Sequence, residues 1–236
     1  MGSVGRSKET DGYHSFPYWS RGTHEYMGDH GETESWFRDN SNFDELVSGM
    51  SRDELGYFEY WTRGWLMGGD QYEGFSNMSD EKQKWTRAYD KILDQAVLDK
   101  PLVVHRLATA ELLLGKDHLR ASEDEIKSML GKEIVQKANM STGAAAVGLS
   151  IGSRKQIDYE IRLPAGKGIG MWVGDNRFNG WGSAQREFMM NRDVVLVPVA
   201  YKKFEETALS RLRPGIEKPQ YTVVLEWRDR LEHDYS

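Results

Sequence analysis

The order of the patterns along this chain restricts its fold more than any other feature, because helical patterns come first and strand patterns follow. Three segments before residue 100 have a capping residue followed by acidic residues, which is typical of helix starts. They are DELVSGM after Asn42, RDELGYFEYWTRGWLM after Ser51 and DEKQKWTRAYDKILDQAVLDK after Ser79. The third segment repeats apolar side chains at helical spacing, which predicts a face that packs on a sheet. These side chains are Trp85, Tyr89, Ile92, Leu93 and Ala96.

The chain from Pro101 onward consists mainly of short segments rich in β-branched and aromatic residues, with one helical pattern at SEDEIKSMLGK. The strand segments are PLVVHRLA, EIVQKANMST, KQIDYEIRLP, GIGMWV, REFMMN, VVLVPVAY and YTVVLEW. Segregated helices and strands predict an α+β fold with a mainly antiparallel sheet rather than alternating βαβ units. The short NRD segment at 191–193 favours an antiparallel hairpin at that point.

Composition limits the domain organisation and excludes several kinds of chemistry. With 236 residues, 39% of them hydrophobic, the chain can bury one sizeable core, which we assign to a single catalytic domain over residues 43–236. Residues 1–42, rich in Gly, Ser, Asp and aromatics, predict an irregular strap. The absence of cysteine excludes disulfides, thiolate catalysis and Cys-ligated zinc, and the net charge of -6 disfavours non-specific nucleic-acid binding.

Other familiar site patterns are not fulfilled. GKGIG at 166–170 lacks the Ser or Thr of a phosphate-binding loop and leads into a strand, so it predicts a turn. DNRFNGWGSAQRE places Arg177 and Arg186 in two calcium-ligand positions, and His14, His24 and His30 fit no zinc spacing. We therefore expect no metal. With no secretory signal and no run of eighteen apolar residues, we expect a soluble protein without a membrane partner.

Three short motifs occur in a characteristic order: VVHR ending at Arg106, NMSTG with Ser141 and Thr142, and SAQREF with Gln185 and Glu187. Together they resemble the R-S-E class of ADP-ribosyltransferases, in which an Arg ends an early strand, a Ser-Thr-Ser strand follows, and a Glu stands two residues after Gln or Glu. The intervening IDYEIRLPAGKGIGMWV is similar to that family's strand, Leu-Pro-x-Gly turn and next strand. The Gln-x-Glu form resembles the small clostridial exoenzymes that modify Rho-type GTPases.

This resemblance, which covers roughly residues 44–228, implies a fold and a reaction. The fold would be N-terminal helices packed on a mainly antiparallel, two-sheet β core. NAD would be the substrate: the enzyme would release nicotinamide and transfer a single ADP-ribose to a macromolecule, with a protein as the acceptor. The site of action would be the cytoplasm, reached by a bacterial or phage effector that is secreted or injected.

The residue types at the three motifs fit this chemistry. The guanidinium of Arg106 can bind the pyrophosphate of NAD through paired, charge-assisted hydrogen bonds. The carboxylate of Glu187 can stabilise the positive charge that develops on the ribose when nicotinamide leaves, and can hold the 2′-hydroxyl. Ser141 would orient that carboxylate by a hydrogen bond from a neighbouring strand, assisted by Thr142 as a second cofactor-binding hydroxyl.

Gln185 lies two residues before Glu187, so on a strand the two side chains emerge from the same face and can reach one cleft. The resemblance therefore implies that Gln185 is a catalytic residue beside Glu187 and Ser141, and that it also recognises the target. Its neutral amide suits an acceptor such as an asparagine side chain or a guanine base. Phe178 and Trp181, in the preceding loop, could stack on nicotinamide or contact the target.

The sequence departs from the family pattern at two positions. Gly143 replaces the third serine, and His105 stands where an aromatic or apolar residue is common. We include His105 among the candidate NAD contacts, with a structural role as the equal alternative. Tyr60 and Arg63 are approximate counterparts of the family's helix-borne contacts.

Two alternatives stay open. The same fold could modify guanine in a nucleic acid, with Lys202, Lys203, Arg211 and Arg213 as a local basic patch. The core could also be catalytically inert, with the aromatic N-terminal segment as the surface of a binding or structural module.

Overall fold

The computed structural model describes residues 8–16, 30–56, 74–115, 117–144, 157–173, 187–204 and 219–235. Its helices are α1 (His30–Asp39), α2 (Phe43–Gly49), the 3-10 helix η2 (Phe75–Asn77), α5 (Asp80–Leu93), α6 (Glu111–Leu114) and α7 (Glu123–Met129). Its strands are β1 (Lys8–Thr10), β2 (Tyr13–Ser15), β3 (Val97–Leu98), β4 (Leu102–Ala108), β5 (Ile134–Gln136), β6 (Met140–Gly143), β7 (Ile157–Leu163), β8 (Gly166–Lys167), β9 (Gly170–Trp172), β10 (Glu187–Met190), β11 (Val194–Lys203) and β12 (Tyr221–Arg230).

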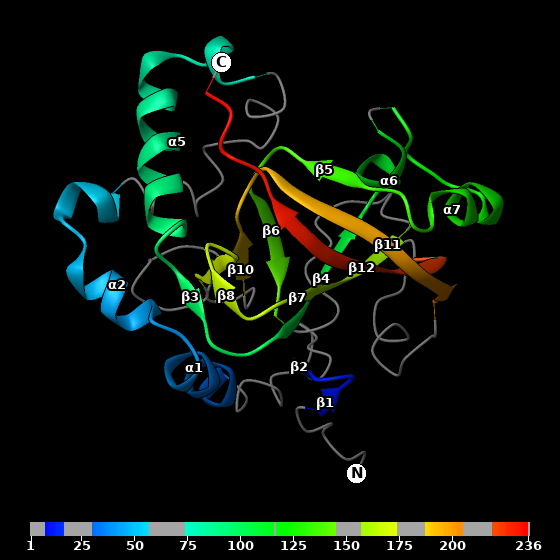
Figure 1. The fold of residues 1–236 in the computed structure, drawn as a ribbon, viewed down its shortest axis with the longest axis horizontal. Coiled ribbons are helices and arrows are strands. Elements are labelled where there is room, and N and C mark those ends of the chain that lie inside the picture. The colour runs from blue at the N-terminus through cyan, green and yellow to red at the C-terminus, as the bar shows by residue number, and fades with distance from the viewer. Residues whose placement is uncertain are drawn as a thin grey trace, which may run out of the picture.

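The strands form a large sheet in the order β5-β11-β12-β7-β4-β6-β10-β9, with the β1–β2 hairpin joined through β2 to β4 and a separate β3–β8 pair (Figure 1). The pairings are antiparallel except for β12 with β7 and β2 with β4. The predicted α+β class with a mainly antiparallel core is therefore confirmed. None of the helices that the structure describes has the length and apolar character needed to span a bilayer.

The large sheet narrows to a single residue pair between β4 and β6. Within the described residues, His105 opposite Gly143 is the one ladder contact that joins them. On one side of this junction lie β5, β11, β12, β7 and β4, and on the other lie β6, β10 and β9. In the described parts of β4 and β6, the two groups of strands thus meet through very little backbone pairing.

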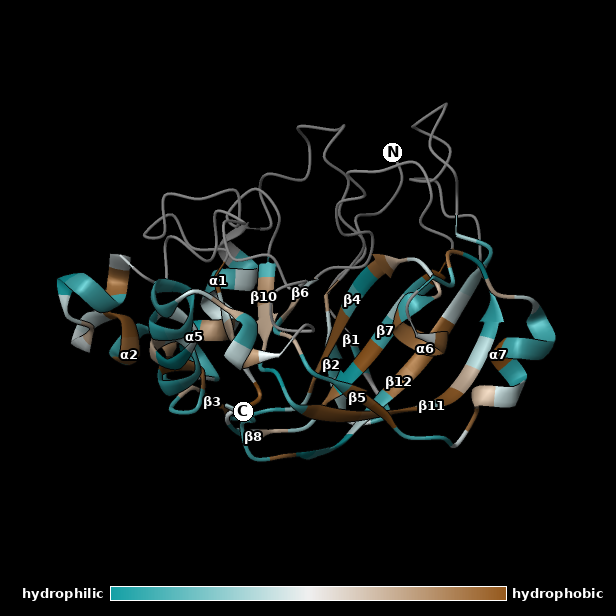
Figure 2. Ribbon diagram, turned by 90° about the horizontal axis from the view of Figure 1, so that it is seen from above, coloured by the Kyte–Doolittle hydropathy of each residue, from teal (hydrophilic) through white to brown (hydrophobic). Residues whose placement is uncertain are grey.

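Helices α1, α2 and α5 gather at the β10 end of the molecule, whereas α6 and α7 lie near β11 (Figure 2). Phe37 of α1 stacks on Trp172 of β9 and Phe188 of β10, with ring centroids 4.7 and 5.9 Å apart. The apolar face predicted for the third helical segment is confirmed within α5, where Tyr89, Ile92 and Leu93 are buried in the core. The helix ends at Leu93 instead of running to residue 100, because residues 97–98 form β3. Burying such aromatic and aliphatic side chains is the main source of stability in this part of the fold.

The predicted helix starts have mixed outcomes. Ser79 caps α5, since its hydroxyl accepts a hydrogen bond from the Lys82 amide. Asn42 precedes α2 but makes no side-chain cap; its Oδ1 instead accepts from the Val97 amide at 2.7 Å, which joins the helix to β3. Ser51 pairs with Glu54 at the start of the next segment, of which the structure describes residues up to 56.

The hairpin predicted at 191–193 is wrong. Strand β10 pairs with β6 and β9, whereas β11 pairs with β5 and β12, so this turn carries the chain from one part of the sheet to the other. The physical reason is that Arg192 of the turn is buried in an ion pair with Asp90 of α5. The segment 1–42 is also more regular than expected, because its described residues include the β1–β2 hairpin and α1.

A substitution at Gly170 would show how tightly β9 packs against β10. A Cβ at this position would lie 2.6 Å from Phe188 Cε1 and 2.9 Å from Met190 Cα, closer than packed atoms can approach. We expect Gly170→Ala to lower the free energy of unfolding by about 1–3 kcal/mol, the usual cost of overpacking, as measured by urea titration. Gly49→Ala is the matched control, because a Cβ there meets nothing within 4 Å. Equal stabilities for the two variants would contradict this packing.

Candidate active site

Strands β6 and β10 bring the predicted serine and glutamate together. Glu187 lies opposite Gly143 and Met189 lies opposite Ser141, so Glu187 and Ser141 are diagonal neighbours across one antiparallel pair. Diagonal side chains on the same face of a sheet are close enough to interact. The Ser141 side chain makes a hydrogen bond to the Glu187 carboxyl group.

Glu187 is a buried carboxyl group, with 6% of its surface exposed. Burial raises its pKa, and the Ser141 hydrogen bond and the positive charge of Arg106 offset that rise only in part. The protein therefore keeps a weakly solvated carboxylate at the end of a strand. Such a group interacts with a developing positive charge more strongly than an exposed one, because little water screens it.

Arg106 lies on β4, across the narrow junction from β6. Its Nη1 donates a hydrogen bond to the backbone carbonyl of Ser141 at 2.6 Å, and the side chain is only partly buried. Because its charge also lowers the pKa of Glu187, the structure brings Arg106, Ser141 and Glu187 together at one place. A partly exposed guanidinium is a group that can bind an anionic ligand through charge-assisted hydrogen bonds.

Tyr89 of α5 belongs to the same surroundings, although the sequence pattern assigned it only to an apolar helix face. The side chain is 1% exposed. Burial raises its pKa, and the negative charges of Glu187 and Asp90 raise it further. The phenol therefore lies within electrostatic reach of the candidate catalytic carboxylate. The one available signal in the sequence was that a buried Tyr needs a polar neighbour for its hydroxyl.

Thr142 and His105 have structural contacts in this structure. The Thr142 hydroxyl donates to the Phe188 carbonyl at 2.7 Å, which reinforces the β6–β10 pairing. His105 Nδ1 lies 3.4 Å from Asp158 Oδ1 on β7, and the Thr222 hydroxyl donates to the other oxygen of the same carboxyl group. Contacts of either residue with NAD stay predictions.

Several predicted residues lie outside the described part of the chain. For target recognition and nicotinamide stacking these are Gln185, Phe178 and Trp181, and for the helix-borne contacts they are Tyr60 and Arg63. Of the proposed basic patch, Lys202 and Lys203 are exposed at the end of β11, whereas Arg211 and Arg213 are outside the described residues. Among the residues that are described, no group of His, Asp and Glu is arranged to hold a metal ion.

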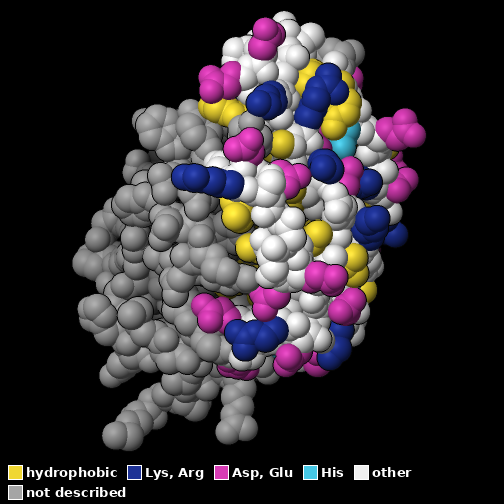
Figure 3. Space-filling model, turned by 90° about the vertical axis from the view of Figure 1, so that its left-hand side faces the viewer, with side chains coloured by type: hydrophobic (Ala, Val, Ile, Leu, Met, Phe, Trp, Pro, Cys, Tyr) yellow, Lys and Arg dark blue, Asp and Glu magenta, His cyan; other side chains and the backbone are white. Residues whose placement is uncertain are grey.

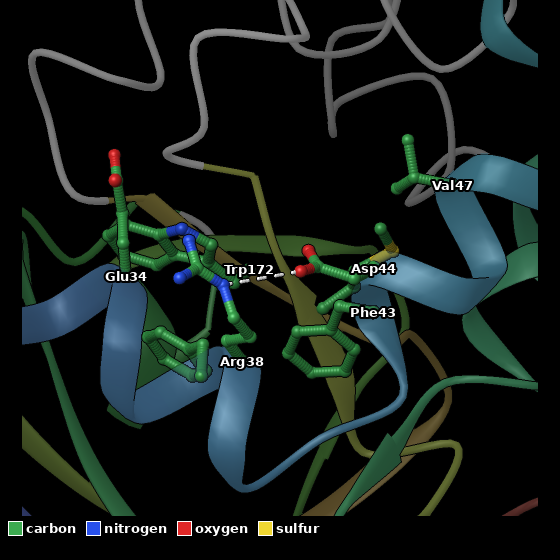
Figure 4. A pocket seen from close by; sticks show the side chains of 8 residues that line it. Glu34, Arg38, Phe43, Asp44, Val47 and Trp172 are labelled. Atoms are coloured by element: carbon green, nitrogen blue, oxygen red, sulfur yellow. Dashed lines mark ion pairs between the residues drawn. The ribbon is translucent and has the colours of Figure 1, made fainter.

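A separate hollow lies between α1, α2 and β9 (Figure 4). Its rim carries an ion pair, with Arg38 Nε 3.6 Å from Asp44 Oδ2, and its floor is aromatic. Arg106, Ser141 and Glu187 do not line it. The lining residues are Glu34, Phe37, Arg38, Phe43, Asp44, Val47, Met171 and Trp172.

The burial of Glu187 has a consequence for stability. Because its folded pKa lies above the ordinary value of 4.5, the folded state binds this proton more tightly than the unfolded state. The carboxyl group therefore costs stability as the pH rises from 4.5 through its folded pKa. We expect Glu187→Gln to melt at a higher temperature than the wild type at pH 8, because the amide carries no buried charge. The advantage should shrink towards pH 4, and a constant difference in melting temperature would contradict the assignment.

Comparisons with known proteins identify the fold. No family model matches the chain, and the search of curated proteins finds no match. Among solved structures, the chain is similar to Plx2a, an ADP-ribosyltransferase toxin from Paenibacillus larvae, with 15% identity, coverage of 85% of this chain and 97% of that one, and a TM-score of 0.62. The C3 exoenzyme of Clostridium limosum gives 12% identity, 93% and 98% coverage, and a TM-score of 0.62.

The enzymatic component C2-I of the Clostridium botulinum C2 toxin gives 18% identity and a TM-score of 0.65 over 84% of this chain, which spans about half of that protein (47%). Other similar structures were solved with NAD, as for C3stau2 from S. aureus, or with NADH. At this level of identity the comparisons establish a shared fold: the chain has the fold of the ADP-ribosyltransferase toxins.

Proposed function

We propose that the protein is an NAD-dependent mono-ADP-ribosyltransferase, which releases nicotinamide and transfers ADP-ribose to a protein. The observation that carries this proposal is the buried Glu187, hydrogen-bonded by Ser141 and within reach of the charge of Arg106. The fold shared with ADP-ribosyltransferase toxins supports the same reaction class. Because a fold can host unrelated activities, the arrangement of these three side chains is the stronger argument.

Each side chain has a defined task in this reaction. Arg106 is partly exposed, and its planar guanidinium carries several N–H donors in a geometry that suits the pyrophosphate of NAD. As the bond between nicotinamide and the ribose C1′ breaks, its electron pair leaves with nicotinamide and C1′ becomes positive. Glu187 stabilises that charge, and Ser141 holds the carboxylate in place. The acceptor then attacks C1′ and loses its proton to a base or to water.

A protein acceptor is favoured over a nucleic acid by the distribution of charge. The chain has a net charge of -6, and on the face that carries α1, α2 and α5 acidic and basic side chains are interspersed rather than segregated (Figure 3). A phosphate backbone would be attracted by a continuous basic surface. A nucleic acid is the second candidate acceptor, because Lys202 and Lys203 are exposed and could bind phosphate groups. We further propose that the protein acts in the cytoplasm of a target cell after secretion or injection.

Replacement of Glu187 tests the reaction. We expect Glu187→Gln to lower kcat for nicotinamide release about 100- to 1000-fold, the range for removing one preorganised charge-stabilising group, while KM for NAD changes little, because the lost interaction is made mainly in the transition state. The matched control is Glu160→Gln, a half-buried strand glutamate on β7 whose carboxylate lies 3.7 Å from Arg162. Equal rates for the wild type and Glu187→Gln would refute the proposal.

The acceptor can be identified with NAD labelled in its adenylate part. The protein is incubated with cell lysate that has been treated with nuclease or with protease, and the label is followed by gel and mass spectrometry. We expect labelled protein that disappears after protease treatment and is absent with Glu187→Gln. Label that survives protease and is lost after nuclease would instead establish a nucleic-acid acceptor.

A further inference from the structure

A partly buried network of polar and charged side chains connects the C-terminal tail to α5 and to the turn after β10. We call it the C-terminal cluster. Figure 1 shows the tail, in red, running beside α5. The members of the cluster are Asp90 and Asp94 of α5, Arg192 and Asp193 of the turn, Arg230 at the end of β12, and His233 and Tyr235 of the tail.

The centre of the C-terminal cluster is a two-pronged ion pair between Arg192 and Asp90. The Arg192 Nε and Nη2 atoms lie 3.0 and 2.9 Å from the two carboxylate oxygens of Asp90, and both side chains are at least 95% buried. Arg192 Nη1 also lies 2.8 Å from Asp193 Oδ2 and donates to the Asp234 carbonyl. A charge buried this deeply is tolerated only when its partners stay in place.

His233 connects the two acidic sides of the cluster. Its Nδ1 lies 3.1 Å from Asp193 Oδ2 and its Nε2 lies 3.1 Å from Asp94 Oδ1, so a protonated imidazole donates to both carboxylates. Asp94 is also bound by Arg230 and by the Asn191 amide. The carboxylates of Asp90, Asp94 and Asp193 contact the guanidinium groups of Arg192 and Arg230, and a protonated His233 adds a further positive charge between them.

The cluster is connected to the candidate active site on two sides. Arg192 stands two residues after Met190, which ends the short strand that begins with Glu187. Asp90 directly follows Tyr89, and the negative charges of Glu187 and Asp90 both raise the pKa of the Tyr89 phenol. The Arg192–Asp90 ion pair therefore joins a residue next to Tyr89 to a residue close to the end of β10.

We propose that the C-terminal tail is a positioning element of the active site, in which protonated His233 locks α5 to the turn after β10 and so holds Tyr89 and Glu187 in their relative orientation. This inference rests on the proposed function. It makes His233 a positioning residue that touches no substrate. Small displacements of a catalytic group have large effects on rate, so the lock should influence kcat more than NAD binding.

The charges around His233 predict the pH range of this effect. Burial lowers the pKa of His233, but hydrogen bonds with Asp193 and Asp94 and the charge of Asp90 outweigh it and raise the pKa to about 9. The ordinary value is 6.5, so the stabilisation is complete below pH 6.5 and is lost as the pH rises through about 9. The other groups around His233 are Arg192, Arg230 and the Tyr235 ring, and Arg87 of α5 packs on that ring with its guanidinium carbon 4.4 Å from the ring centroid.

The test compares His233→Gln and Tyr235→Phe with the wild type by nicotinamide release between pH 6 and pH 10, well below the melting temperatures. We expect His233→Gln to lower kcat about tenfold at neutral pH, to leave KM for NAD within twofold, and to abolish the fall in kcat that the wild type shows near pH 9. Tyr235→Phe, which removes only the hydrogen bond to Asp90 at 3.0 Å, should have a smaller effect in the same direction. If His233→Gln fails to fold, Tyr235→Phe still tests the inference, because it weakens the same cluster with a smaller change.

Two control variants separate positioning from general loss of stability. Glu232→Gln alters an exposed neighbour on the same tail, and Tyr201→Phe removes a hydrogen bond to Glu123 on the distant α7. Both should keep the wild-type kcat and its pH profile. A wild-type kcat and alkaline fall in His233→Gln, or an equal loss of kcat in Tyr201→Phe at equal melting temperature, would overturn the inference.

Hydrogen exchange gives a readout that does not depend on turnover. His233→Gln should exchange faster than Glu232→Gln at the amides of residues 80–93 and 187–190, and unchanged exchange at both segments would overturn the inference. If the wild type releases no nicotinamide, the proposed function fails, and this measurement still decides whether the tail holds the two segments together.

Discussion

The pairing of β6 with β10 determines the geometry of the candidate site, because it alone places the Ser141 side chain beside the Glu187 carboxyl group. A slip of one residue in this register would turn Glu187 to the opposite face of the sheet. The register is supported on both sides of β10. The Thr142 hydroxyl donates to the Phe188 carbonyl, and the Phe188 ring packs against Phe37 of α1.

The same pairing leaves the Glu187 carboxyl group largely buried, so its ionised form lowers the stability of the fold. One hydrogen bond from Ser141 and the nearby charge of Arg106 do not restore the pKa of Glu187 to its ordinary range. A better solvated carboxylate would be more stable but would stabilise a positive ribose less. The aromatic packing of Phe37, Phe188 and Trp172 next to this strand offsets part of that cost.

The sequence predicted the elements better than their partners. Periodicity and the Ser79 cap identified α5, and short β-branched segments identified the strands, because both signals are local. Strand pairing is not local, so the hairpin at 191–193 was wrong. The ion pair that explains the error joins Asp90 and Arg192 across 102 positions. Arg106, Ser141 and Glu187 were found through their order in a family pattern, whereas Tyr89 was assigned only to an apolar face.

Because the described junction between β4 and β6 is narrow, side-chain contacts must help to fix the relative orientation of the two groups of strands at this site. One residue pair cannot fix the relative orientation of two groups of strands, since twist between neighbouring strands varies widely. Additional constraints come from Arg106, which donates to the Ser141 carbonyl, and from Arg192, which ties the turn after β10 to α5. Both contacts are made by guanidinium groups, whose planar set of donors fixes the orientation of the bonded groups as well as their separation. The candidate catalytic carboxylate lies on the strand between these two constraints, and its orientation follows from both.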